Sequence, residues 1–255
     1  MTRCVLALLF VLLLAVQAHA QSEEDNDDLV IDATFVSCSD TTESLLILRD
    51  GRAIYALGNH GAAFSVSDLL LADLKKMIDT VKSSTSSRNM DSCATLGLIV
   101  EGPKFLLINR TKPSPGTRAL YAEIERQRKI GERRMTGTIE RFAGKAQEEP
   151  DSTMETPAYV EPVEIRKRVR LSPVAREWRC TGTVYAAVLI TNKGKVLQAF
   201  VQKVQSRGKC ASVLTTAALR AVLLANYQPA TNHKGRPMNS WIQVEVPFTH
   251  AHHTP

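Results

Sequence analysis

The sequence of 255 residues lacks the common catalytic signatures. It has no G-x-S-x-G nucleophile elbow, no H-E-x-x-H zinc pair, no P-loop and no dinucleotide-binding glycine pattern. Ser206–Lys209 fits the Ser-x-x-Lys pattern of penicillin-binding enzymes, but neither Ser-Asp-Asn nor Lys-Thr-Gly follows it. The sequence therefore predicts a protein that recognises a partner and is not an enzyme.

Clustered metal ligands are also scarce. Three of the six histidines, His250, His252 and His253, lie in the last six residues. A chain end does not fix imidazoles in a metal-binding geometry, because it has few packing or second-shell contacts. No metal and no cofactor is predicted, and residues 251–255 are expected to be a disordered tail.

Long apolar runs are missing as well. The run Val5–Val16 has twelve residues, whereas a membrane-spanning helix needs roughly 20. It follows Arg3 and precedes an A-x-A site that ends at Ala20, the order typical of a cleaved secretory signal. Residues 1–20 are thus predicted to be a signal peptide, and the mature protein to be periplasmic or secreted without stable membrane insertion. The alternative is an uncleaved anchor.

Cysteine is used sparingly, with five in the chain. Removing the signal removes Cys4 and leaves an even number, which in an exported protein indicates disulfides. Four cysteines allow three pairings. The domain boundary given below separates them two and two and favours Cys38–Cys93 and Cys180–Cys210.

Charge is unevenly distributed around a net value of +6. Residues 23–28 are acidic, and residues 21–28 are predicted to be a disordered tail. Residues 110–145 hold ten Lys or Arg against four Glu. An exported protein rarely meets nucleic acid, so a solvated helix face and linker is predicted for this stretch, and no nucleic-acid partner.

The rest of the chain predicts an α+β protein with two small domains, residues 29–130 and residues 164–250, joined by a Pro-containing linker at residues 131–163. The first domain is predicted to contain strands, a helix capped by Ser65, a second hairpin and a second helix. Strands are expected at 29–38 and 43–57, the second with a turn at Asp50-Gly51, and a helix is expected after Ser65. A second hairpin is expected at 96–109 and a second helix at 117–128.

The second domain is predicted to be a ββαβ antiparallel sheet packed on a helix. The strands are expected at 182–191, 196–204 and 241–248, with a turn at 192–195 that uses Gly194. The helix is expected to begin at a Ser212 or Thr215 cap and to end at Leu224.

A series of small motifs runs through this second domain: Gly-x-Val, a hairpin, a helix followed by aromatic-x-Pro-Ala, Gly-x-Pro and a closing strand. They fall at Gly182, Val184, Tyr227, Pro229, Ala230, Gly235, Pro237 and Phe248. Over residues 164–250 this order resembles the C-terminal domain of TonB-type energy transducers. The resemblance implies a periplasmic protein-binding module whose last strand pairs with a short segment of an outer-membrane receptor.

The closing strand is the predicted binding site. Apolar residues alternate with polar ones along it, and Pro247 favours an edge position because proline has no amide hydrogen to donate. An open edge offers unpaired N–H and C=O groups to an extended peptide. The residues expected to bind an envelope protein or receptor peptide are Trp241, Gln243, Val244, Glu245 and Val246.

The strand at 182–191 is apolar on both faces, so both faces should be covered. The helix covers one face, and the first domain, a second copy of the chain or a partner covers the other. Two other functions stay open: a membrane-anchored TonB-type transducer, and an enzyme or cell-wall-binding protein whose site lies in residues 29–130.

Overall fold

A computed structural model describes residues 29–36, 42–80, 95–100, 104–109, 117–147, 152–206 and 208–249. The predicted signal peptide, the acidic tail, the Cys38–Cys93 bridge and the C-terminal histidines lie outside the described residues. "N-terminal part" below means the described residues up to 147, and "C-terminal part" means those from 152 onward.

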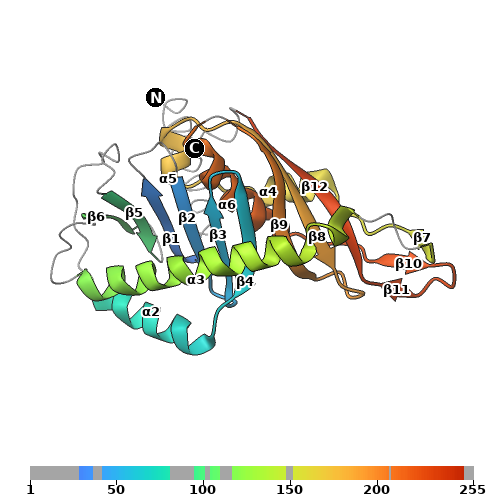
Figure 1. The fold of residues 1–255 in the computed structure, drawn as a ribbon, viewed down its shortest axis with the longest axis horizontal. Coiled ribbons are helices and arrows are strands. Elements are labelled where there is room, and N and C mark those ends of the chain that lie inside the picture. Colours follow the sequence, from blue (N-terminus) through green and yellow to red (C-terminus); the bar gives the residue numbers. More distant parts are fainter. Residues whose placement is uncertain are drawn as a thin grey trace, which may run out of the picture.

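One antiparallel sheet of nine strands forms the centre of the fold, in the order β12-β8-β9-β4-β3-β2-β1-β5-β6 (Figure 1). The mixture of this sheet with helices confirms the α+β class. The strands are β1 (Leu29–Val36), β2 (Thr42–Leu48), β3 (Arg52–Leu57), β4 (His60–Ser65), β5 (Thr95–Val100), β6 (Lys104–Asn109), β8 (Gly182–Ile190), β9 (Val196–Gln205) and β12 (Ser240–Phe248).

Helices cover both faces of this sheet. Helix α6 (Cys210–Leu224) lies on one face, while α3 (Arg118–Phe142) lies across the other with α2 (Asp68–Thr80) beside it (Figure 1). Each face has its own apolar core, because successive strand residues point to opposite faces. The remaining elements are η1 (Lys145–Gln147), α4 (Pro162–Arg168), α5 (Pro173–Glu177) and a small sheet of β7 (Met154–Thr156), β10 (Ala230–Asn232) and β11 (Pro237–Met238).

The hairpins predicted in the N-terminal part are present, and one strand was missed. Gly51 takes a positive φ of 81° between β2 and β3, a conformation that glycine adopts without steric cost. β5 and β6 form the second predicted hairpin. Strand β4, HGAAFS, was not predicted, because its small residues have weak strand propensity.

The helix predictions for this part need two corrections. Ser65 ends β4, and the α2 cap is Ser67, whose Oγ accepts a hydrogen bond from the Leu70 amide at 3.3 Å. The helix predicted at 117–128 continues to Phe142, so part of the predicted linker is helix. It continues because its buried stripe goes on past residue 128, through Gly131 and Met135.

The predicted ββαβ unit is present as β8, β9, α6 and β12. The α6 prediction was wrong at its start: the helix begins at Cys210, so Ser212 and Thr215 lie inside it. Every residue from Ala211 to Leu223 is buried. A helix that is buried all round is enclosed by other elements, here the sheet with α4 and α5.

Both ends of α6 are bonded to the N-terminal part. The Thr42 hydroxyl of β2 donates to the Lys209 carbonyl at 2.6 Å, just before the helix. At the other end, Arg52 Nη1 of β3 donates to the Leu223 carbonyl at 2.5 Å. The two parts thus share one helix and one sheet, and the predicted division into two domains stays a prediction.

Candidate protein-binding edge

Strand β12 is the outermost strand of the large sheet at the end that belongs to the C-terminal part (Figure 1). It pairs with β8 over nine consecutive residue pairs, from Ser240–Ile190 to Phe248–Gly182, without a register shift. Within the described part of the chain, no strand pairs with its other side. The predicted edge position is therefore present, and the strand is regular along its whole length.

The two faces of β12 differ sharply. Val244 and Val246 are buried in the core that α6 covers, with 5% and 0% of their surfaces exposed. Gln243 and Glu245 lie on the other face and are exposed. The side chains of the two valines in the predicted site are therefore not accessible to a partner.

Trp241 has a packing role in this strand. Its ring lies 5.7 Å from the ring of Phe142 in α3 and 5.7 Å from that of Phe200 in β9, centroid to centroid. These contacts fix the beginning of β12 against the end of α3. Of the five predicted binding residues, only Gln243 and Glu245 combine an exposed side chain with an edge position.

Pro247 indicates which backbone groups of β12 face outward. Proline in a sheet is tolerated where its nitrogen faces away from the neighbouring strand. In a regular antiparallel strand, the N–H and C=O groups of alternate residues point to the same side. The backbone polar groups of Trp241, Gln243 and Glu245 are therefore directed to the open edge, and those of Val244 and Val246 to β8.

The other side of this three-stranded unit is not open in the same way. β9 meets β4 through one ladder pair, Phe200 with Ala62, and the Gln198 side chain donates to the Ala63 carbonyl at 2.8 Å. On the sheet face opposite α6, Ala187 is buried in the core that includes α3. The sequence left three alternatives for what covers this second face of β8, and the structure shows that the N-terminal part covers it.

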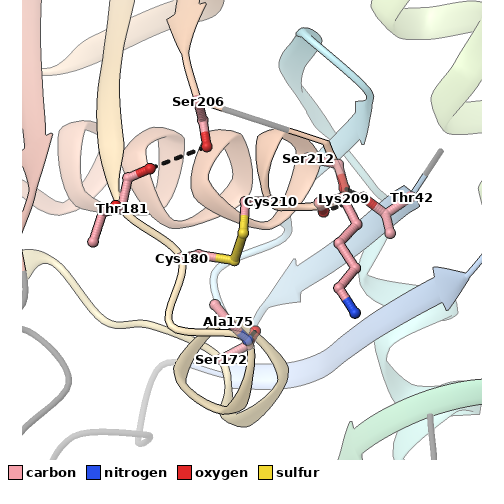
Figure 2. Close-up of a disulfide and its surroundings, with 9 residues drawn as sticks. All are labelled: Thr42, Ser172, Ala175, Cys180, Thr181, Ser206, Lys209, Cys210 and Ser212. Atoms are coloured by element: carbon pink, nitrogen blue, oxygen red, sulfur yellow. Dashed lines mark hydrogen bonds between the residues drawn. A yellow bond between two sulfur atoms is a disulfide. The ribbon is translucent and has the colours of Figure 1, made fainter. Parts of the chain in front are cut away.

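A disulfide joins Cys180, just before β8, to Cys210, the first residue of α6, with 5.4 Å between their Cα atoms (Figure 2). This is the pairing that the sequence favoured. Around it, Ser206 donates to the Thr181 carbonyl at 3.1 Å, and Lys209 Nζ lies 4.3 Å from the centroid of the Trp178 ring. The bridge fixes the start of β8, and with it the end of the β8–β12 ladder, to α6.

Two groups of charged residues lie away from this edge. Glu43 accepts hydrogen bonds from Tyr55 and Arg128 between the sheet and α3. Asp32 and Arg220 line a small cavity on the α6 face, where burial raises the pKa of the Asp32 carboxyl to about 6 although Arg220 opposes the shift. Sequence reasoning missed both groups, because each joins elements far apart in the chain.

Among the described residues, no group of His, Cys, Asp or Glu side chains is arranged to hold a metal ion. The same residues include no helix that is both long and apolar enough to cross a membrane.

The comparison with protein families agrees with this geometry. Residues 167–250 match the family described as Gram-negative bacterial TonB protein C-terminal. These residues form a TonB C-terminal domain. Domains of this family are protein-interaction modules of the bacterial envelope. The match spans α5, β8, β9, α6, β10, β11 and β12 and leaves the N-terminal part unassigned.

No curated protein and no solved structure matches the chain significantly.

Proposed function

We propose that the protein is an exported interaction module of the envelope, and that it binds an extended peptide of an envelope protein by strand addition along β12. The observation that carries the proposal is the regular, outward-facing backbone of β12 within the TonB C-terminal domain. Strand addition needs a row of unpaired N–H and C=O groups on a strand that stays flat over several residues.

The N-terminal part supports this role by leaving one edge of the domain open. Its strand β4 lies against β9, and its helix α3 holds Trp241 and Phe200. A peptide that adds to the ββαβ unit therefore meets β12 as the accessible strand. We propose that the N-terminal part acts as a scaffold that fixes this edge in position.

The test compares proline substitutions at positions whose amides face the open edge with one at a position whose amide faces β8. Gln243→Pro removes an outward amide, so the protein should fold while its affinity for an added strand falls at least about tenfold, since hydrogen bonds and strand geometry are lost together. Glu245→Pro should act in the same way. Gln243→Thr keeps the amide and should bind within about twofold of the unchanged protein. Val244→Pro removes an amide that faces β8 and should destabilise the fold itself.

The measurement is fluorescence anisotropy with synthetic peptides that cover the periplasm-facing segments of outer-membrane receptors, after circular dichroism has verified folding. Unchanged affinity in folded Gln243→Pro and Glu245→Pro proteins would remove β12 as the site. If the protein binds no peptide but sediments as a dimer that Gln243→Pro dissociates, a second copy of the chain is the partner.

Export is tested separately. The proposed signal cleavage predicts a mature protein that begins at Gln21 and is soluble after cell lysis. Mass spectrometry that finds Met1 in a membrane fraction would instead support a membrane-anchored transducer.

A further inference from the structure

A recess lies beside the disulfide, where β8 begins and β9 ends. Its volume is about 610 Å³, and its described lining residues are Arg179, Thr181, Gly182, Gln205, Ser206 and Cys210. Of the two bridged cysteines, Cys210 lines the recess and Cys180 does not. The recess therefore gives access to one side of the bridge.

Cys210 is also more exposed to solvent than Cys180. Cys180 is 1% exposed and belongs to the core that α6 covers. Cys210 is partly exposed at the first position of α6 (Figure 2). Thiol–disulfide exchange requires an incoming thiolate to reach one sulfur, and access decides which sulfur is attacked. We therefore expect an attacking group from solvent to reach Cys210 before Cys180.

The charge around the recess selects among attacking groups. Arg179 contributes a cation, and no Asp or Glu is among the described residues that line it. The hydroxyl-bearing residues Thr181 and Ser206 add polar groups to the wall. A small thiol that carries a carboxylate or sulfonate is favoured there over a cationic thiol, because the Arg179 guanidinium attracts an anion and repels a cation.

We propose that Cys210 is a site of thiol–disulfide exchange with small anionic thiols and their disulfides. The thiolate attacks Cys210 Sγ and forms a new S–S bond with it. The Cys180–Cys210 bond breaks, and its electron pair leaves on Cys180 Sγ, which takes a proton from solvent. One disulfide is consumed and one is formed, so no oxidant is required.

The first test compares the two half-bridges. Cys180→Ser leaves Cys210 as a thiol, Cys210→Ser leaves Cys180, and the Cys180→Ser/Cys210→Ser double variant gives the background from the other cysteines. The probe is 5,5′-dithiobis(2-nitrobenzoate), whose release of a coloured thiolate reports attack by the protein thiol. In folded protein, Cys210 should react at least about tenfold faster than Cys180, and in denaturant the two rates should become similar.

The second test addresses charge. With cystamine as a cationic probe, the ratio of the two probes' rates at Cys210 gives its preference for the anion. Arg179→Gln should lower this ratio about two- to fivefold, and high salt should have the same effect on the unchanged protein. A ratio that neither Arg179→Gln nor salt alters would remove Arg179 from the proposal.

The unchanged protein provides the third measurement, which does not depend on the stability of any cysteine variant. After incubation with reduced glutathione and an acid quench, peptide mapping should place the mixed disulfide on Cys210. A mixed disulfide on Cys180, or equal reactivity of the two half-bridges in folded protein, would overturn the proposal. So would the absence of any mixed disulfide on Cys210 under conditions that reduce the bridge of the denatured chain.

Discussion

Glu43 links three elements on the α3 face of the sheet. Its carboxylate lies on β2 and accepts hydrogen bonds from the Tyr55 hydroxyl of β3 at 2.7 Å and from Arg128 of α3 at 2.6 Å. Arg128 also donates to Glu125 at 2.9 Å. Burial and the Glu43 carboxylate raise the pKa of Tyr55, and the neighbouring carboxylates raise the pKa of Arg128 although burial opposes that shift. Tyr55 thus stays neutral and Arg128 stays positively charged at neutral pH.

Replacing Glu43 should therefore weaken the attachment of α3. In Glu43→Gln, the half-buried Arg128 keeps Glu125 but loses a charged partner, and we expect the free energy of unfolding to fall by about 1–3 kcal/mol. The matched control is Arg126→Gln. The Arg126 side chain is 61% exposed, so its ion pair with Glu123 should contribute less than about 0.5 kcal/mol to the free energy of unfolding. Urea unfolding at low and moderate salt measures both. Equal effects of the two variants would contradict the proposed link.

Asp32 predicts a pH dependence of stability. Its carboxyl has a pKa of about 6 in the folded protein against 3.8 for an unperturbed Asp, mainly because of burial. The folded state therefore binds this proton more tightly than the unfolded state, and stability is lost as pH rises from about 4 through 6. Asp32→Asn should match the unchanged protein near pH 4 and exceed it near pH 7 by at most about 3 kcal/mol. Urea unfolding at the two pH values is the test, and a difference that does not grow with pH would contradict it.

At the scale of single elements, local signals predicted the hairpins and the closing strand well. Asp50-Gly51 and Gly194 mark turns by backbone geometry, and the alternation along 241–248 marks a half-buried strand. The element that the sequence did not predict in full, α3, depends on tertiary contacts with the sheet. The second half of α3 is rich in charge and contains two glycines, so its helical period is weak until the sheet below it is known.

The two glycines of α3 provide a matched pair of substitutions. A Cβ at Gly131 would lie 2.8 Å from Tyr55 Cβ, whereas a Cβ at Gly137 would meet nothing within 4 Å. Gly131→Ala should cost about 1–3 kcal/mol by forcing α3 away from the sheet. Gly137→Ala should stabilise the protein by about 0.5–1 kcal/mol through helix propensity. Thermal unfolding distinguishes them, and a stabilised Gly131→Ala protein would show that α3 does not lie this close to β3.

At the scale of the whole molecule, the position of the proposed binding edge depends on contacts that no local pattern contains. The sequence predicted the position of the edge, because Pro247 and the polar alternation are local features. It could not predict that Ala187 would be buried in the core to which α3 contributes, or that Thr42 and Arg52 would bond to the two ends of α6. These contacts join residues more than 160 positions apart in the case of α6, and their partners are set by the fold.

These contacts predict that the TonB C-terminal domain depends on the N-terminal part. A fragment of residues 164–250 loses the Thr42 and Arg52 bonds to α6 and exposes the apolar face that α3 covers. We expect it to unfold at a lower urea concentration than the full chain and to self-associate, because an exposed apolar sheet face is buried when two copies associate.

Within the full chain, Arg52→Met should increase hydrogen exchange at the end of α6, since the Leu223 carbonyl loses its charged donor. Chemical unfolding, gel filtration and exchange mass spectrometry measure these outcomes. A monomeric fragment with the same unfolding midpoint as the full chain would show instead that the two predicted domains fold independently.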